Sequence, residues 1–165
     1  MKLLMRFVIV LLIGFLGLVF WAGINKDQTA ANSSEFTTIT GSKVALKDLR
    51  GKPVLVTFWA TTCGSCMKEI PHLIDLYNRF HNKGFELIAV AMAYDPPNQV
   101  VQLARDRALP YTIALDINGE HANAFGGIWA TPTTYLIDKD GKISWETIGM
   151  FEPDELAERI EKQLM

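Results

Sequence analysis

Residues 53–66, PVLVTFWATTCGSC, decide the fold of this chain. The first eight form a nearly continuous apolar run, rich in β-branched and aromatic side chains, which is typical of a strand buried on both faces of a sheet. Two cysteines, Cys63 and Cys66, follow this run, and the chain contains no others. The stretch therefore predicts a central strand that leads directly into a cysteine-bearing loop.

The sequence on either side of this stretch predicts an α/β domain. Apolar residues recur at steps of three and four after the cysteines, which indicates an amphipathic helix up to Phe80. The next segments predict strands at 85–93, 111–115, 133–138 and 142–148 and helices at 100–109, 120–125 and 152–164. The right-handed crossover rule makes the two long strands parallel, while the final hairpin is antiparallel, so we expect a mixed sheet flanked by helices.

The first 24 residues have the pattern of a membrane anchor. Lys2 and Arg6 precede residues 7–24, which carry no charge, and a bilayer core of about 30 Å needs roughly 20 apolar helical residues. Basic residues before the segment favour a cytoplasmic N-terminus with the rest exported. A cleaved signal peptide is the alternative, although its apolar region usually runs only about 7–15 residues. We expect an anchor at 1–24, a polar linker at 25–35 and one domain at 36–165.

The charge of the chain gives no sign of a nucleic-acid partner. The formal net charge is −2, and no run is rich in lysine or arginine. A basic patch is the usual electrostatic footprint of nucleic-acid binding. We therefore expect partners to be recognised through a site, with no nucleic acid among them.

The spacing of the cysteines favours a reactive pair. A cysteine at a helix start meets unpaired backbone N–H groups, which stabilise the thiolate and can lower its pKa to roughly 3.5–7.5. Cys63 holds that position, and Cys66, one turn later, is placed to attack a mixed disulfide formed at Cys63. Gly64 removes side-chain bulk between them, which should help a partner's sulfur to approach.

Other uses of the cysteines stay open from the residues alone. A structural disulfide over so short a loop restrains the unfolded chain little. A metal site needs more ligands, and His72, His81 and His121 show no spacing typical of zinc ligands. Haem attachment needs histidine after the second cysteine, where this chain has Met67.

Glu69 and Pro132 are further candidates near the cysteines. Glu69, three residues after Cys66, is either a proton carrier for that thiol or an ordinary exposed helix acid. Pro132 is either a turn proline or a cis-proline after Thr131, which would expose backbone groups to an extended substrate. Trp59 and Trp129 either flank the site or belong to the core and its rim.

Several of these segments, in this order, resemble the thioredoxin-like family. They are CGSC after a buried strand, KEIP on the next helix, and TPTTYLID followed by DGKI. Together with ALKDLRGKPVLVTFWAT, they resemble most closely the membrane-anchored TlpA/ResA/CcmG group of bacterial thiol–disulfide oxidoreductases, from about Gly41 to the C-terminus. The resemblance implies a thioredoxin-like fold after an N-terminal transmembrane helix, with residues 95–125 as an inserted helix-and-strand segment.

The resemblance also implies roles for residues. Cys63 attacks, Cys66 resolves, Glu69 is the acid near the pair, and Pro132 is a cis-proline that faces the disulfide. The only redox group is then the Cys63–Cys66 disulfide, with no cofactor and no metal. We assign contacts with substrate to Trp59, Thr62, Gly64, Ser65, Trp129, Thr131 and Pro132. Many members have tryptophan at position 62 and proline at position 65, so the redox potential does not carry over.

The resemblance implies a disulfide reductase on the periplasmic side of the bacterial inner membrane. It would act as a monomer on exported proteins, with apocytochrome c or copper-delivery proteins as clients, and a membrane electron donor of the DsbD/CcdA type would regenerate the dithiol. Two other functions remain open, namely a disulfide oxidase or isomerase, and a module that binds copper(I) through the same two cysteines.

Overall fold

The computed structural model of the chain describes residues 6, 11–15 and 33–165. Apart from residues 6 and 11–15, which are helical, the predicted anchor at 1–24 lies outside the described residues, as does the linker up to residue 32. In the part of the chain that is described, no helix combines the length and apolar character needed to cross a membrane. The first strand begins at Glu35, so the folded domain includes the last residue that we assigned to the linker.

A mixed sheet forms the centre of the domain. Seven strands in the described part follow the order β2-β1-β5-β4-β3-β6-β7. They are β1 (Glu35–Thr38), β2 (Lys43–Ala45), β3 (Val54–Trp59), β4 (Glu86–Ala91), β5 (Thr112–Leu115), β6 (Thr133–Ile137) and β7 (Ile143–Ile148). β3 pairs in parallel with β4 and β6 pairs antiparallel with β7, which confirms the predicted directions. In addition, β6 pairs antiparallel with β3.

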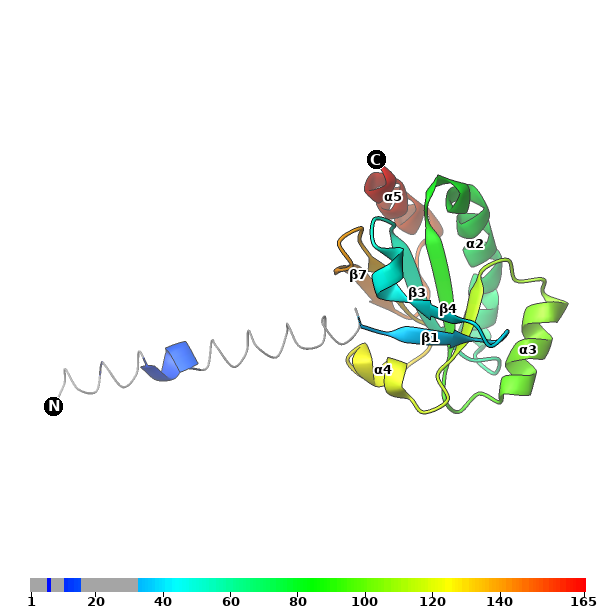
Figure 1. The fold of residues 1–165 in the computed structure, drawn as a ribbon, viewed down its shortest axis with the longest axis horizontal. Coiled ribbons are helices and arrows are strands. Elements are labelled where there is room, and N and C mark those ends of the chain that lie inside the picture. Colours follow the sequence, from blue (N-terminus) through cyan, green and yellow to red (C-terminus); the bar gives the residue numbers. More distant parts are fainter. Residues whose placement is uncertain (1–5, 7–10, 16–32) are drawn as a thin grey trace.

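Helices cover both faces of this sheet (Figure 1). The helices are α2 (Gly64–Phe80), α3 (Pro97–Asp106), α4 (Glu120–Ala124) and α5 (Pro153–Leu164), with short 3-10 helices η1 (Leu46–Leu49) and η2 (His81–Lys83). One apolar cluster joins α2, α3 and α5 to one face, and a second joins η1 and α4 to the other. The result is a three-layer α/β domain.

The alternation of side chains along β3 explains why this strand is central. Leu55 and Trp59 belong to the cluster under α2, whereas Val56 and Phe58 belong to the cluster on the opposite face. All six residues of β3 are buried. A strand with both faces covered reads as a continuous apolar run, as this one does.

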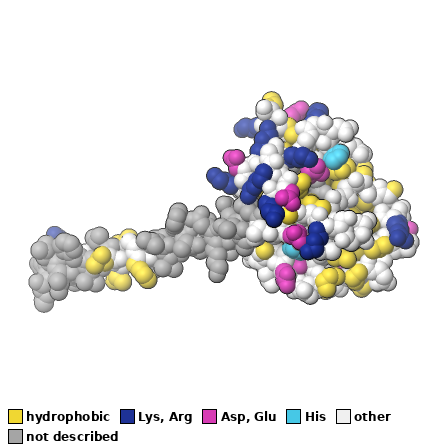
Figure 2. Space-filling model, in the orientation of Figure 1, with side chains coloured by type: hydrophobic (Ala, Val, Ile, Leu, Met, Phe, Trp, Pro, Cys, Tyr) yellow, Lys and Arg dark blue, Asp and Glu magenta, His cyan; other side chains and the backbone are white. Residues whose placement is uncertain are grey.

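Most charged side chains lie on the outside of the domain, while Glu69, Asp95 and Asp116 are buried. On the face drawn in Figure 2, acidic and basic side chains are interspersed. The ion pairs include Lys43–Glu35 at 2.6 Å and Lys52–Glu86 at 2.8 Å, whose side chains all remain partly in solvent. Such surface pairs each contribute at most about 1 kcal/mol, so the two apolar clusters carry most of the stability.

The N-terminal hairpin was not predicted from the sequence. β1 pairs with β2 on one side and with β5 on the other, both antiparallel. Through β5, the inserted segment therefore connects this hairpin to the rest of the sheet. Phe36 on β1 is fully buried in the cluster that includes α4, so this hairpin is part of the core.

Candidate functional site

The two cysteines lie where β3 passes into α2. A turn, closed by the hydrogen bond from Cys63 N–H to the Ala60 carbonyl oxygen (3.1 Å), leads to Cys63 at the N-cap of α2. Its Sγ accepts a hydrogen bond from Cys66 N–H at 3.1 Å and is joined to Cys66 by a disulfide. Cys63 is half-buried, whereas only 3% of Cys66 is exposed. A partner can therefore reach Cys63 first.

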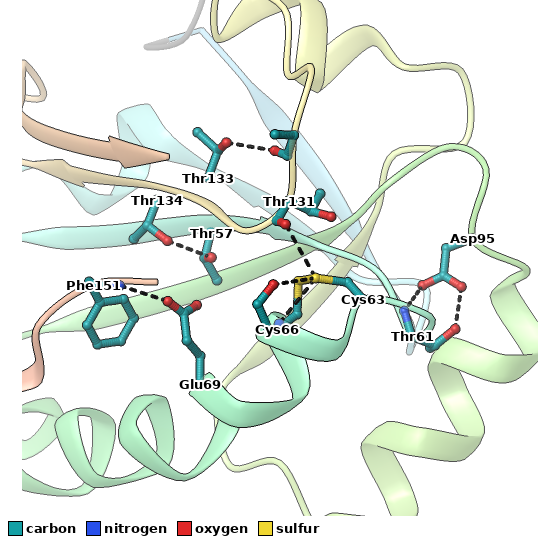
Figure 3. The surroundings of a disulfide bond; sticks show 12 residues. Thr57, Thr61, Cys63, Cys66, Glu69, Asp95, Thr131, Thr133, Thr134 and Phe151 are labelled. Atoms are coloured by element: carbon teal, nitrogen blue, oxygen red, sulfur yellow. Dashed lines mark hydrogen bonds between the residues drawn. A yellow bond between two sulfur atoms is a disulfide. The ribbon is translucent and has the colours of Figure 1, made fainter. Parts of the chain in front are cut away.

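A cis-proline segment faces the disulfide. The Thr131–Pro132 peptide bond is cis, as the resemblance implied. The carbonyl oxygen of Thr131 lies 3.4 Å from Cys63 Sγ (Figure 3). The Pro132 carbonyl oxygen accepts a hydrogen bond from Gly149 N–H at 2.8 Å, which holds this segment against the end of β7. Backbone groups of Thr131 therefore adjoin the sulfur that a substrate must reach.

Glu69 is buried on the other side of Cys66. Only 1% of the residue is exposed, and its carboxylate accepts a hydrogen bond from Phe151 N–H at 3.0 Å. Burial raises the pKa of Glu69 from 4.5 to about 7, while the hydrogen bond from Phe151 acts in the opposite direction. The interpretation of Glu69 as an exposed helix acid is therefore wrong. A carboxyl group with this pKa gains and loses a proton near neutral pH.

A small internal cavity connects Glu69 to the disulfide. Its lining includes Cys66, Glu69, Trp59, Thr57 and Tyr111. Trp59 is 5% exposed, and its indole N–H has no hydrogen-bond partner among the residues that the structure describes. Burial also raises the pKa of Tyr111. Trp59 therefore lies in the core behind the disulfide, where it is not available to a protein partner.

The other predicted contact residues lie at the surface. Trp129 is 78% exposed, two residues before Thr131. Thr62 and Gly64 are exposed on either side of Cys63, and a Cβ atom added to Gly64 would meet nothing within 4 Å. Ser65 is half-buried, and its Oγ lies 3.3 Å from Cys63 Sγ. Of these residues, Ser65 is the one whose side chain contacts the reactive sulfur.

The structure adds Asp95, which sequence reasoning missed. Asp95 follows β4 and is 5% exposed. Its two carboxylate oxygens accept hydrogen bonds from the backbone N–H and the Oγ1 of Thr61, each at 2.6 Å (Figure 3). The signal was its position after a buried strand that runs parallel to β3, because the carboxyl ends of parallel neighbours meet at one edge of a sheet. Asp95 thus fixes the loop that carries Cys63.

The three histidines lie at separate positions and do not form a shared site with the cysteines. His81 stacks on Tyr77 with 4.4 Å between ring centroids, and His121 lies 4.6 Å from the ring of Phe36. His72 is exposed on α2. Among the described residues, no group of three or more His, Cys, Asp or Glu side chains is arranged to hold a metal ion.

Comparison with known proteins gives consistent matches over the domain. Residues 26–164 match the Redoxin family model. The thiol–disulfide oxidoreductase ResA of Bacillus cereus is 34% identical over 168 residues, which cover 98% of this chain and 96% of that protein. The chain is also similar to the crystal structure of StoA from Bacillus subtilis, with 26% identity, a TM-score of 0.66 and coverage of 76% of this chain and 93% of StoA. The solution structure of a thioredoxin-named protein from Neisseria meningitidis is 33% identical, with a TM-score of 0.76 and coverage of 81% and 89%.

Proposed function

Because the chain belongs to the redoxin family, as a thioredoxin-like thiol–disulfide oxidoreductase of the TlpA/ResA/CcmG type, we propose that it reduces disulfides in exported proteins. One observation carries the proposal: a half-buried cysteine at a helix start is joined to a buried cysteine that shares a cavity with a buried acid. This arrangement provides one sulfur for attack, one for resolution and a group that exchanges the proton.

In the first step, the Cys63 thiolate attacks one sulfur of the client disulfide. A Cys63–client disulfide forms, the client's own S–S bond breaks, and the released client thiolate takes a proton from solvent. The α2 N-terminus favours the thiolate of Cys63, because its Sγ accepts the hydrogen bond from Cys66 N–H. The backbone of Thr131 lies beside the attacked bond and can pair with the extended client chain.

In the second step, Cys66 resolves the mixed disulfide. The ionised Glu69 carboxylate accepts the proton of the Cys66 thiol, and the Cys66 thiolate then attacks Cys63 Sγ. The Cys63–Cys66 disulfide forms and the second client thiolate leaves, so two electrons have passed from the protein to the client. A pKa of about 7 makes Glu69 suited to this proton transfer near neutral pH.

The surroundings of Cys63 support the reducing direction. A strong oxidant such as DsbA requires a strongly stabilised reduced form. Among the described residues, the polar contacts of Cys63 Sγ are with Ser65 Oγ, the Thr131 carbonyl oxygen and Cys66 N–H, and none involves a basic side chain. The carbonyl oxygen presents its negative end to the sulfur. We expect a reduction potential nearer to about −270 mV, as in thioredoxin, than to about −120 mV, as in DsbA.

The site of action and the partners belong to the same proposal. The apolar segment at residues 7–24 supports an anchor in the bacterial inner membrane with the domain in the periplasm. In that oxidising compartment a membrane electron donor must reduce the Cys63–Cys66 disulfide again after each reaction. We propose a donor of the DsbD/CcdA type, as the family resemblance implies. Clients that must keep cysteines reduced, such as apocytochrome c or copper-delivery proteins, fit this chemistry.

A trapping experiment tests the proposal. In a Cys66→Ser variant the mixed disulfide at Cys63 cannot be resolved, so clients should remain covalently attached when the variant is expressed in its own host. The double variant with Cys63→Ser and Cys66→Ser is the control that should capture nothing. Failure to recover any exported protein on Cys63, together with a potential near about −120 mV, would contradict the reductase proposal.

A further inference from the structure

A groove lined by seven polar or charged residues and by Leu103 lies beside the loop that carries the reactive cysteine. It has a volume of about 590 Å³ and runs between the loop before Cys63 and helix α3 of the inserted segment. Thr61 and Thr62 line one side, and Asn98, Gln99 and Gln102 of α3 line the other. Because Thr62 lines this groove and directly precedes Cys63, the groove adjoins the loop that carries the attacking sulfur.

The wall of this groove is held in place from beneath. The buried carboxylate of Asp95 accepts both hydrogen bonds from Thr61, at 2.6 Å each. The Oγ1 of Thr61 also lies 3.4 Å from Oε1 of Gln99 across the groove. Figure 3 shows Thr61 and Asp95 on the opposite side of Cys63 from Glu69, so this network does not belong to the proton-transfer site. A groove fixed in advance loses less entropy when it binds a partner.

The hydroxyl and amide side chains in the lining of the groove match the hydrogen-bonding groups of a polypeptide backbone. Hydroxyl and amide side chains both donate and accept hydrogen bonds, as the N–H and C=O groups of an extended chain require. The charged residues of the lining, Asp106 and Arg107, have opposite signs. Gln102 already donates a hydrogen bond to Asp106 at 2.8 Å, whereas Asn98 is exposed at the surface of the groove.

We propose that this groove binds the extended client chain that flanks the cysteine attached to Cys63. This inference rests on the proposed reductase function and names the surface that selects its clients. The residues that do so, Asn98, Gln99 and Gln102, belong to the inserted segment. The groove thus gives α3 a role in client binding, in addition to the contacts at Thr131.

Peptide disulfides of different length test the groove with the full chain. Three oxidised peptides share a Cys-Gly-Gly-Cys core, and they carry no flank, six residues before the core, or six residues after it. The second-order rate constant for their reduction by the prereduced protein is measured. One flank should raise this rate constant about five- to tenfold, because two or three hydrogen bonds of ordinary strength give at least this factor.

Bulky substitutions should remove the gain from the flank. In Asn98→Trp and Gln102→Trp, an indole fills the groove, so the flanked peptide should react no faster than the core. Asn78→Trp is the matched control, since Asn78 is also exposed on a helix but does not line the groove. A small aromatic disulfide should react equally fast with all four proteins, which shows that Cys63 remains intact. Asn98→Ala and Gln102→Ala provide milder variants should either tryptophan disturb folding.

The outcomes separate this inference from the function on which it rests. If wild type reduces the core but gains nothing from either flank, or if the gain survives in all the groove variants, the groove inference is wrong. If wild type reduces neither the core nor the small disulfide, the proposed function fails and the inference with it. A gain that is lost equally in Asn78→Trp also contradicts the assignment to this groove.

Discussion

Replacement of Glu69 by glutamine should change the pH dependence of stability. Glu69 is 1% exposed, and burial raises its pKa from 4.5 to about 7. Between these two pH values the folded state keeps a proton on Glu69 that the unfolded chain has already released. Folding therefore becomes less favourable as the pH rises through this window. Glutamine has no ionisable group, so Glu69→Gln should lose this part of the pH dependence.

The size of the effect follows from the displaced pKa. One pKa unit corresponds to 1.36 kcal/mol, so a rise from 4.5 to about 7 costs the folded state about 3 kcal/mol once the pH exceeds 7. Below about pH 4.5 the carboxyl group is neutral in both states and the cost is absent. The amide oxygen of glutamine can still accept the hydrogen bond from Phe151 N–H, which preserves the contact with the loop between β7 and α5.

Urea unfolding of the oxidised full chain measures this effect. The free energy of unfolding is determined between pH 4 and pH 8.5 for wild type, for Glu69→Gln and for the control Glu158→Gln, which changes an exposed acid on α5. As the pH rises, the free energy of unfolding of Glu69→Gln should increase by about 3 kcal/mol relative to that of wild type. The free energy of unfolding of Glu158→Gln should vary with pH in the same way as that of wild type. A Glu69→Gln profile that is also parallel to wild type would refute the claim that Glu69 titrates in a buried site.

Two further predictions concern hydroxyl groups near the site. Ser65→Ala removes the hydroxyl 3.3 Å from Cys63 Sγ, which would donate to the thiolate, so we expect a higher thiol pKa and a reduction potential lower by about 20 mV. Equilibration with glutathione measures the potential, and an unchanged or higher value contradicts this role. Thr134→Val leaves the buried hydroxyl of Thr57 without its partner at 2.8 Å and should cost about 1–3 kcal/mol in urea unfolding. The double variant with Thr57→Val should recover part of that loss, and no recovery would show that packing, not the hydrogen bond, is responsible.

The central part of the fold could be predicted because its signals are local. The apolar run at 53–60 and the three- and four-residue spacing after the cysteines correspond to β3 and α2. The final hairpin was predicted from the strand segments at 133–138 and 142–148, and β6 and β7 have the predicted antiparallel pairing. These elements contain five residues or more, which is enough for a period to become visible in the sequence.

The N-terminal hairpin could not be predicted for the opposite reason. β1 (EFTT) and β2 (KVA) contain only three apolar residues between them, Phe36, Val44 and Ala45, so no apolar run marks either strand. The position of β1 in the sheet depends on β5, more than 70 residues later in the chain. The hairpin is stabilised by this distant pairing and by the burial of Phe36. Neither contact can be recognised from the pattern of apolar and polar residues at 35–45.

The burial of Glu69 and the role of Asp95 also depend on distant residues. The partner of Glu69 is the backbone of Phe151, 82 positions later, and the partner of Asp95 is Thr61, 34 positions earlier. Helical spacing places Glu69 near Cys66, but the pKa of its carboxyl group is set by the elements packed over it. The sequence therefore pointed to Glu69 as a candidate acid but not to its burial. It gave no indication that Asp95 fixes the loop before Cys63.

The structure separates Thr62 and Ser65, the two positions at which we expect this chain to differ from many of its relatives. Ser65 contacts the sulfur of Cys63 directly, so its hydroxyl acts on the relative energies of the thiolate and the disulfide. Thr62 instead lines the groove beside α3, where the client chain is proposed to bind. A substitution at position 65 should therefore change the reduction potential of the Cys63–Cys66 pair, which affects the reaction with every substrate alike. A substitution at position 62 should change which polypeptides react quickly while the potential stays nearly constant. We therefore expect the direction of electron transfer and the choice of client to be controlled at different positions of the four-residue segment from Thr62 to Ser65.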